Sequence, residues 1–388
     1  MQKWLLISFI LIHCKIGFAQ KETTVFESGQ EGYAIFRIPS IVQLPNKKII
    51  AFAEGRVNGG ADFGNIKIVL KTSKDQGKTW SPLKVVATYD HWQVGNAAPV
   101  IDLLDPAYPN GKIYLFYNTG NVSEYDLRLG KGIREVWFIS STDQGDTWSS
   151  PTNITSQVHY PNGTMEGRKY SNNKDWRTYA NTPGHAIQCM EGKYKGRIFI
   201  PANHSVGMPK ANFRDYYAHG YYTDDHGKTF KISESLNIAG SNEATAAFIS
   251  KGGLYMNVRN QPGDIRSRIV AYSSNGGQTF DTSQYDTHLT DPVCEGAVLN
   301  LGKRKGKAIL AFVNASDSAY RNNLTLKISF DEGRSWPIQQ LIDGTDDAVK
   351  AKKDYTAYAD LIKLEPKKVG VLYEKENYSK IVFKQVKW

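Results

Sequence analysis

The chain has 388 residues, and its 48 Lys and Arg against 38 Asp and Glu give a formal net charge of +10. This length fits two average domains or one large all-β unit, and the plentiful Tyr, Trp, Phe, Val, Ile and Thr favour the all-β unit. The lysines are scattered along the sequence instead of forming runs, which argues against a nucleic-acid-binding protein, so we expect no nucleic-acid partner.

The N-terminal residues have the pattern of a secretory signal peptide. Lys3 precedes the apolar run Leu5–Ile12, and Gly17-Phe18-Ala19 provides a small-x-small cleavage site. The apolar run is too short for a membrane span, which needs about 20 residues. We expect residues 1–19 to be removed, leaving residues 20–388 as one secreted or periplasmic domain without a membrane span.

A lipid anchor is the alternative to a cleaved leader. Leu11-Ile12-His13-Cys14 resembles a lipoprotein signal, but His13 stands where a small residue is expected before the cysteine. Two further cysteines, Cys189 and Cys294, follow the leader. An exported protein can join them in one disulfide, although a single pair does not make a disulfide scaffold.

Short apolar or alternating segments recur along the chain, and turn-forming residues flank most of them. Each has the length of a β-strand: Lys48–Ala53, Lys112–Tyr117, Arg197–Pro201, Gly253–Val258, Ala308–Val313 and Val369–Tyr373. No stretch keeps a helical period over about twelve residues. The only helix that we expect is a short one around Thr345–Lys353, so the chain is predicted to be all-β.

A short motif, Ser-x-Asp-x-Gly-x-Thr-Trp, recurs along the chain. Strong copies stand at Ser73–Trp80, Ser141–Trp148 and Ser329–Trp336, and weaker ones at Thr223–Phe230 and Ser273–Phe280. In each copy the third side chain can accept hydrogen bonds from turn amides, the glycine can take a conformation closed to other residues, and the aromatic ring can pack on a sheet. Such repeats indicate the blades of a propeller, with one motif clipping each hairpin.

These motifs are the Asp-boxes of sialidases, and from Tyr33 to Tyr373 the chain resembles bacterial exo-sialidases of glycoside hydrolase family 33. The resemblance implies a six-bladed β-propeller. Asp-boxes occur in several propeller families, so they indicate the fold and leave the function open. We therefore expect their aspartates to hold turns and to stay outside the functional site.

Three arginines match the positions with which sialidases grip the carboxylate of their substrate. Arg37 lies in Phe36-Arg37-Ile38-Pro39, Arg259 in Met256–Asn260 and Arg321 in Tyr320–Thr325. Guanidinium groups are planar, permanently charged and multiply donating, so three of them fix both the position and the orientation of a carboxylate. A single arginine more often forms a surface salt bridge, and it is the combination of three that indicates a substrate site.

Other residues match the family's supporting and sugar-lining positions. Glu374 is implied to orient Arg37, with an exposed strand-end glutamate as the alternative. Arg56 and Asp102 are implied to line the polar edge of the sugar around its O4 and N-acetyl groups. Three tryptophans are candidates for the pocket of the N-acetyl methyl group, and each can equally be a core residue: Trp92, Trp137 and Trp176.

Tyr358 matches the catalytic nucleophile of sialidases, and Glu243 matches the base that takes its proton. Sialidases are exceptions among retaining glycosidases in using a tyrosine. The anomeric carbon of sialic acid already bears a carboxylate, so a neutral phenol avoids the repulsion that an anionic nucleophile would meet. A phenol with a pKa near 10 needs a neighbouring base. Tyr355 is the competing tyrosine, but its place relative to Glu374 is less favourable, and an ordinary turn carboxylate is the alternative for Glu243.

Asp62, in Gly59-Gly60-Ala61-Asp62-Phe63-Gly64, is implied to be the general acid and base. It would protonate the departing oxygen and later take a proton from water. A carboxyl group on a glycine-flanked loop can approach the leaving group and shield it from solvent. The alternative is that Asp62 only forms a turn with Gly64.

Together these residues imply a retaining exo-α-sialidase that removes terminal sialic acid from glycoproteins, glycolipids or oligosaccharides through a covalent sialyl-tyrosine intermediate. Sialyl transfer to another sugar, or intramolecular release of an anhydro-sialic acid, would use the same residues. A propeller that binds glycans without turnover is the alternative from another class. The sequence has no metal-binding or nucleotide-binding motif, so we expect no cofactor and no metal, and we expect a monomer.

Overall fold

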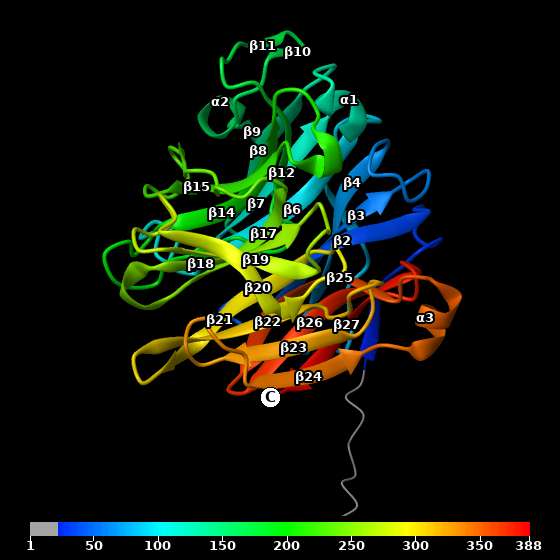
Figure 1. The fold of residues 1–388 in the computed structure, drawn as a ribbon, viewed down its shortest axis with the longest axis vertical. Helices are drawn as coiled ribbons and strands as arrows, with labels where there is room; N and C mark the ends of the chain where they lie inside the picture. Colours follow the sequence, from blue (N-terminus) through cyan, green and yellow to red (C-terminus); the bar gives the residue numbers. More distant parts are fainter. Residues whose placement is uncertain (1–21) are drawn as a thin grey trace, which may run out of the picture.

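The computed structural model describes residues 22–388, so the expected signal peptide of residues 1–19 lies outside the described residues. Strands make up most of this region, and Figure 1 shows the sheets following one another around a common centre, from the blue N-terminal strands to the red C-terminal ones. No helix within residues 22–388 is long and apolar enough to cross a membrane.

The strands form sheets in chain order. An eight-stranded sheet contains β2 (Ile35–Gln43), β3 (Ile49–Arg56), β4 (Ile66–Ser73), β5 (Lys84–Ala87), β6 (Gln93–Asp102), β7 (Lys112–Gly120), β8 (Arg134–Ser141) and β9 (Thr152–Asn153). A small hairpin of β10 (Gly163–Met165) and β11 (Arg168–Tyr170) precedes a five-stranded sheet of β12 (Trp176–Asn181), β13 (Ile187–Gln188), β14 (Ile198–Val206), β15 (Tyr216–Thr223) and β16 (Lys231–Ile232).

Three four-stranded sheets complete the circle. The first contains β17 (Ser241–Phe248), β18 (Leu254–Asn260), β19 (Ser267–Ser273) and β20 (Thr282–Thr290). The second contains β21 (Gly296–Arg304), β22 (Lys307–Ala315), β23 (Leu324–Ser329) and β24 (Ile338–Asp343). The third joins the C-terminal strands to the N-terminal one and contains β25 (Thr356–Glu365), β26 (Lys368–Lys375), β27 (Lys380–Lys387) and β1 (Glu22–Glu27).

This arrangement is an all-β propeller, as the sequence predicted. The first strand of each sheet lies innermost, and β2, β25, β21 and β17 contact one another in turn around the centre. Four sheets of four or five strands are separate units, where six were expected. The eight-stranded sheet holds two antiparallel halves, and one residue pair between the parallel strands β4 and β6, Ile66 with Gln93, joins them.

Helices are few and short. The expected helix around Thr345–Lys353 is α3 (Asp346–Ala351). The sequence analysis missed α1 (Glu124–Arg128), α2 (Thr155–Val158) and the 3₁₀ turns η1 (Ala211–Phe213) and η2 (Ser250–Gly252). Each is about one turn long and therefore shows no helical periodicity.

The two cysteines of the described region do not pair. Cys189 and Cys294 are both buried free thiols. Cys294 packs with Ile38, Ala357 and Tyr358, and its burial raises the pKa of the thiol to about 12. Neither thiol is therefore a reactive thiolate at neutral pH.

All five Asp-boxes form the same hydrogen-bonded turn. Asp75 accepts hydrogen bonds from the hydroxyls of Ser73 and Thr79, at 2.8 and 2.6 Å, and from the backbone N–H groups of Lys78 and Thr79, at 3.0 and 2.9 Å. Equivalent bonds in the other boxes are accepted by Asp143, Asp225, Asn275 and Asp331. The predicted role of these side chains is confirmed.

The box glycines also pack against the preceding group of strands, which for Gly145 is the first half of the eight-stranded sheet. Each has a positive φ, and a Cβ on Gly145, Gly227 or Gly333 would lie 2.8, 2.9 or 2.7 Å from a neighbouring side chain, which belongs respectively to Ile50, Tyr114 and Tyr255. Gly77 lies in the same way against the ring of Phe383 in β27. The boxes therefore hold neighbouring groups of strands together as well as closing their own hairpins.

A Gly77→Ala substitution should destabilise the protein by about 2–4 kcal/mol, because it adds a left-handed backbone strain to a collision with the Phe383 ring. Gly167→Ala is the matched control: Gly167 also has a positive φ, of 78°, but no atom lies within 4 Å of its Cβ position. Thermal or urea unfolding of both variants would measure the difference. Equal losses of stability would show that packing between sheets at the Asp-box contributes little.

Candidate functional site

A cavity of about 450 Å³ opens where the inner strands begin. Strands β2, β6, β12, β17 and β25 contribute residues to its wall, and β3 and β18 contribute residues at their C-terminal ends. The wall includes seven of the nine predicted site residues: Arg37, Arg56, Asp62, Glu243, Arg259, Arg321 and Tyr358. Glu374 is fully buried directly behind this wall, and Asp102 is elsewhere.

Irregular strand pairing shapes the wall. The antiparallel register shifts between Arg37 and Ser40 in β2, Gly95 and Ala98 in β6, Trp176 and Tyr179 in β12, Ser241 and Ala244 in β17, and Thr356 and Ala359 in β25. A β-bulge bends its strand and re-aims a side chain. Glu243 and Tyr358 both lie within such bulges, as does Asn96, which has a φ of 56°.

Buried carboxyl groups accept hydrogen bonds from the backbone at these bulges. Glu374 accepts from the N–H groups of Ile38, at 2.9 Å, and Tyr358, at 3.2 Å, and so joins β2 to β25. Glu295 accepts from the N–H of Ala359 at 3.0 Å. Burial raises the pKa of Glu295 well above its usual value, which favours its neutral form. The strand that carries Tyr358 is therefore held from two sides.

Tyr358 and Glu243 form the closest pair in the cavity. The Tyr358 hydroxyl lies 2.6 and 2.8 Å from the two oxygens of Glu243, and it donates to this carboxylate. Arg259 Nη1 lies 2.7 Å from Glu243 Oε2 and 2.8 Å from the Tyr358 hydroxyl oxygen. A phenol, a carboxylate and a guanidinium group thus share one hydrogen-bonded cluster.

The resting phenol is neutral. Burial raises the pKa of Tyr358 well above 10, the negative charge of Glu243 adds to this, and Arg259 and Arg321 oppose it. Among residues 22–388, Glu243 is the only group within hydrogen-bonding distance that can take the phenolic proton. Because Arg259 contacts both oxygen atoms, it can stabilise negative charge on either side of the proton transfer.

Three guanidinium groups surround Tyr358. The central carbons of Arg37 and Arg321 each lie 5.4 Å from the centre of its ring, and Arg259 contacts its hydroxyl. Arg37 uses Nε to bond Glu374, at 2.6 Å, while no hydrogen bond within residues 22–388 is made by its two Nη atoms. The structure therefore brings the three predicted arginines together, with donors of Arg37 left for an anionic ligand.

Tyr378 supports two of these arginines and was missed by the sequence analysis. The guanidinium of Arg37 stacks 4.1 Å from its ring centre, and Arg321 Nη1 donates to its hydroxyl at 3.1 Å. The hydroxyl in turn donates to Asp354. As one of 22 tyrosines in a turn between β26 and β27, Tyr378 carries no local sequence signal of this role.

Arg56 and Asp62 face each other at the rim. Arg56 Nη1 lies 2.7 Å from Asp62 Oδ1, and Glu54 binds the other side of the guanidinium at 2.7 Å. The Asp62 side chain is 78% exposed. Desolvation near the protein surface opposes its ionisation, but the charge of Arg56 prevails and lowers the pKa of Asp62 below its usual value. Asp62 is therefore ionised while it is paired with Arg56.

Asp102 does not belong to the cavity, and the prediction for this residue is wrong. It is the last residue of β6, about 20 Å along the strand from Asn96, which does line the cavity. Its buried carboxylate accepts from Gln188 Nε2, at 2.5 Å, and pairs with His226 Nδ1, at 2.7 Å. With Asp105 and His226 it forms the one group of possible metal ligands within residues 22–388, but its oxygens are occupied by these bonds.

Asn96 and Glu54 are the polar residues that the sequence analysis missed on this side. The Asn96 N–H donates to Glu54 Oε1 at 2.9 Å, and Glu54 also binds Arg56. The Gly95-Asn96 pair interrupts an otherwise apolar strand, and Glu54 stands two residues before Arg56. These two features are the sequence signals that could have identified them.

None of the three candidate tryptophans lines the cavity. Trp137 bonds Thr119, Trp92 stacks near Phe63, and Trp176 stacks on His204 with ring centres 3.4 Å apart. The apolar part of the wall comes instead from Tyr179, Ala180, Phe213 and Tyr216. Trp176 and Tyr179 are packed against three buried histidines, His159, His204 and His219.

These histidines should make the protein sensitive to acid. Burial lowers the pKa of His219 to about 3 and those of His159 and His204 well below 6.5. A lowered folded-state pKa means that their contribution to stability is complete above the unfolded-state pKa, near 6.5, and is lost as the pH falls below it. Each of the three histidines should add up to about 1.4 kcal/mol per pH unit to the loss of folding stability below this pH.

Urea unfolding between pH 7 and about 3.5 would measure this slope. His219→Asn should reduce the dependence of the unfolding free energy on pH by the uptake of about one proton. This change of slope is expected even if the substitution also alters the stability at pH 7. His288→Asn is the control, because the His288 side chain is 83% exposed. A His219→Asn slope equal to that of the unsubstituted protein would show that His219 is protonated in the fold.

The arrangement suits one kind of chemistry. A ligand carboxylate can bind among the three arginines, directly beside the Tyr358 hydroxyl and its base. An attacking phenolic oxygen would then meet the carbon that bears this carboxylate, while Asp62 stands at the rim where a leaving group would depart.

Comparisons with known proteins agree with this geometry. The sequence profile of the BNR repeat-like domain matches residues 47–376. A sialidase of Micromonospora viridifaciens is 26% identical over 371 residues, which are 89% of this chain and 51% of the relative, so the chain spans about half of that protein. The structure of the Hadza microbial sialidase Hz136 superposes with a TM-score of 0.76 at 23% identity, over 94% of this chain and 68% of that one.

A second solved structure has the same fold. The leech intramolecular trans-sialidase superposes with a TM-score of 0.72 at 16% identity, over 96% of this chain and 70% of that one. At 23% and 16% sequence identity, these two superpositions show that the chain shares its fold with both proteins.

Proposed function

This chain belongs to the BNR repeat-like domain family, and on that basis we propose that it is an exo-α-sialidase acting on terminal sialic acid of glycoconjugates. One observation carries the proposal: the phenol of Tyr358 lies between a carboxylate base, Glu243, and three arginines. A nucleophile that is neutral at rest and surrounded by cations suits a substrate whose reacting carbon bears a carboxylate. The sialidase relatives support the same substrate class.

We infer a retaining mechanism in two steps. In the first, the Tyr358 oxygen bonds to the anomeric carbon as its proton passes to Glu243, and the bond to the aglycone oxygen breaks. Asp62 gives that oxygen a proton. In the second step Asp62 takes a proton from water, the water oxygen bonds to the anomeric carbon, and Tyr358 leaves and recovers its proton from Glu243.

The Arg56–Asp62 pair has a consequence for this mechanism. Asp62 must be protonated when the aglycone departs, but Arg56 favours its ionised form in the free protein. A sugar bound against Arg56 would separate the two groups, and loss of the neighbouring cation raises the pKa of a carboxyl group. Substrate binding would therefore prepare Asp62 to act as an acid.

Tyr358→Phe should lower turnover of a fluorogenic sialoside at least about 100-fold, because no oxygen remains to bond the anomeric carbon. Tyr355→Phe is the matched control, since Tyr355 does not line the cavity. Mass analysis of the product identifies the reaction: free sialic acid indicates hydrolysis. No turnover by the unsubstituted protein between pH 4 and 8 would overturn the proposed activity, and a fully active Tyr358→Phe variant would overturn the proposed nucleophile.

Asp62→Asn should lower the turnover of a natural sialyl-oligosaccharide by about 100- to 10,000-fold, the usual range for a general acid. An aryl sialoside has a leaving group that departs without full protonation, so its turnover should fall much less in the bond-breaking step. Steady-state kinetics of both substrates with one variant would measure the ratio. Equal losses on the two substrates would contradict the role of Asp62 as the acid.

The leech structure favours one alternative. Because a trans-sialidase shares this fold, intramolecular release of an anhydro-sialic acid is the second candidate reaction. Its product is lighter than free sialic acid by one water, so the same mass analysis separates the two. Transfer to an added sugar would appear as a new sialyl-oligosaccharide.

We also infer that the propeller has six blades, that residues 20–388 form one exported domain, and that the protein is a monomer. The blade count is supported by the single residue pair that joins the two halves of the eight-stranded sheet. Export is supported by the sequence pattern of residues 1–19.

A further inference from the structure

A second cavity opens on the opposite side of the propeller. It measures about 550 Å³, and its wall is formed by the C-terminal ends of the inner strands. Tyr358 and Leu361 illustrate the relation, because they belong to the same strand, β25, and line the first and the second cavity respectively. Strands β2, β6 and β17 likewise contribute to both. The two cavities therefore open on opposite faces.

The wall of this second cavity is mainly apolar. Val42, Val100, Phe248, Leu299 and Ile362 line it. Two of its apolar residues also reach solvent at the mouth: Met190 is 47% exposed and Leu103 is 41% exposed. These side chains form an apolar centre on this face.

Basic turns surround one side of the apolar centre. They follow the inner strands β13, β17, β21 and β25 and are joined by the ion pair of Lys303 with Glu191 and by the bond from Lys363 Nζ to Leu301 O, at 2.7 Å. We call these side chains the basic turn face; all nine are exposed: Lys193, Lys195, Lys251, Lys303, Arg304, Lys305, Lys307, Lys363 and Lys367. Lys303 is the only one of them with an ion pair inside the described region.

The basic turn face accounts for the positive charge of the described protein. Residues 22–388 contain 45 of the 48 Lys and Arg, since Lys3, Lys15 and Lys21 precede them, and all 38 Asp and Glu. The basic turn face has nine of these basic residues, and the exposed acidic residues of the same turns are two, Glu191 and Glu365, which leaves 36 residues of each sign elsewhere. The remainder of the described protein is neutral, so its net charge is concentrated here.

We propose that this face docks on an anionic lipid bilayer. Clustered lysines and arginines are attracted to acidic headgroups, and exposed apolar side chains at the same level can enter the interfacial region. An anionic polysaccharide would use the charge but would leave the apolar centre in contact with water. Docking would direct the cavity of Tyr358 away from the bilayer. This proposal does not depend on the sialidase proposal.

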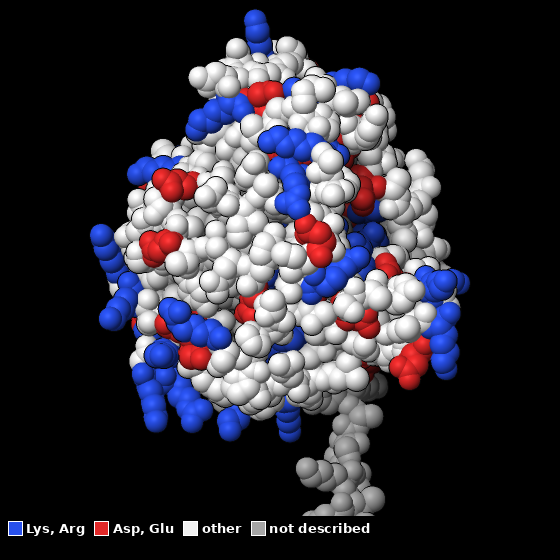
Figure 2. All heavy atoms as spheres, viewed as in Figure 1, with Lys and Arg blue, Asp and Glu red and all other residues white. Residues whose placement is uncertain are grey.

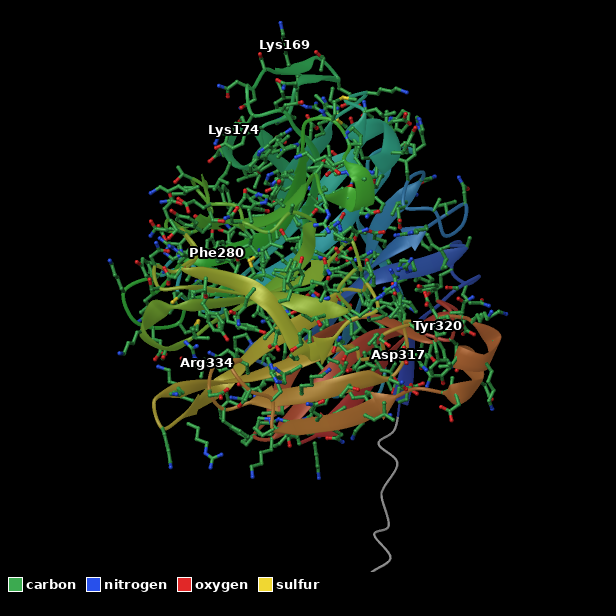
Figure 3. The ribbon with its side chains drawn as sticks, viewed as in Figure 1. Lys169, Lys174, Phe280, Asp317, Tyr320 and Arg334 are labelled. Atoms are coloured by element: carbon green, nitrogen blue, oxygen red, sulfur yellow. The ribbon has the colours of Figure 1, made fainter. Side chains whose placement is uncertain are left out.

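A control for the binding test needs exposed lysines that lie away from the basic turn face. Figure 2 shows basic side chains projecting together at the lower left, along the yellow and orange elements of Figure 1. Figure 3 shows Lys169 and Lys174 at the opposite end from Arg334, and both lysines are exposed. A double Lys→Gln substitution at Lys169 and Lys174 therefore removes the same charge as one within the basic turn face.

The test is sedimentation of the full protein with vesicles of phosphatidylcholine alone and of phosphatidylcholine mixed with phosphatidylglycerol. Binding is expected only to the anionic vesicles, and high salt should weaken it. Lys305→Gln with Lys307→Gln should lower the partition coefficient about 10- to 30-fold, while Lys169→Gln with Lys174→Gln should leave it nearly unchanged. Met190→Ser with Leu103→Ser should also weaken binding, with the basic residues intact.

Turnover of a soluble substrate, or the unfolding midpoint, serves to check that each variant is folded. Absence of binding to anionic vesicles, equal binding to both kinds of vesicle, or equal effects of the two double lysine variants would each overturn the proposal. Binding to heparin without binding to vesicles would also overturn it and would assign the face to a soluble polyanion.

Discussion

The unpaired edges of the inner strands are the constraint on which this structure depends. In a propeller the innermost strand of each sheet faces the axis, where no further strand supplies acceptors for its N–H groups, and buried backbone groups need partners. Here carboxyl groups replace the missing strand. Glu374 and Asp360 accept from β2, Glu295 accepts from β25, and Glu54 accepts from β6. Of these groups, Glu374 and Glu295 bind the backbone at and next to Tyr358, and Glu54 lines the cavity.

A few side chains therefore both support the backbone of the inner strands and position the groups of the site. Glu374 joins two strands through their N–H groups and also holds Arg37, so the position of the first arginine depends on the closure of the ring. Burial favours the neutral form of Glu295, which limits the negative charge close to Tyr358 and Glu243. The cations around Tyr358 keep their attraction for an anionic ligand, and the buried phenol keeps its proton although Glu243 lies within hydrogen-bonding distance.

The sequence predicted the features that depend on residues close together in the chain. It missed the features that depend on the pairing register of distant strands. Asp-box turns are local, so their hydrogen bonds followed from the motif. The three arginines and Tyr358 were found by resemblance, and the structure brings them together. Asp102 was assigned to the cavity by resemblance, but it lies at the other end of β6 from the bulge at Asn96, which does line the cavity. The Gly95-Asn96 pair was the local sign of that bulge, and the sequence analysis did not use it. The basic turn face was missed because its lysines are scattered along the chain and meet only in the folded ring.

The pairing of β1 with β27 has a consequence for the order of events during synthesis. Glu22 lies opposite Lys384, so β1 must wait for β27 to be made before their sheet is complete. That sheet carries both Tyr358 and Glu374. Contacts between segments that are far apart in a chain form slowly, since a large loop must close before these contacts can stabilise the fold. A chain that stops before β27 therefore leaves β26, which carries Glu374, without its neighbouring strand, so the support of Tyr358 is incomplete until β27 has been added.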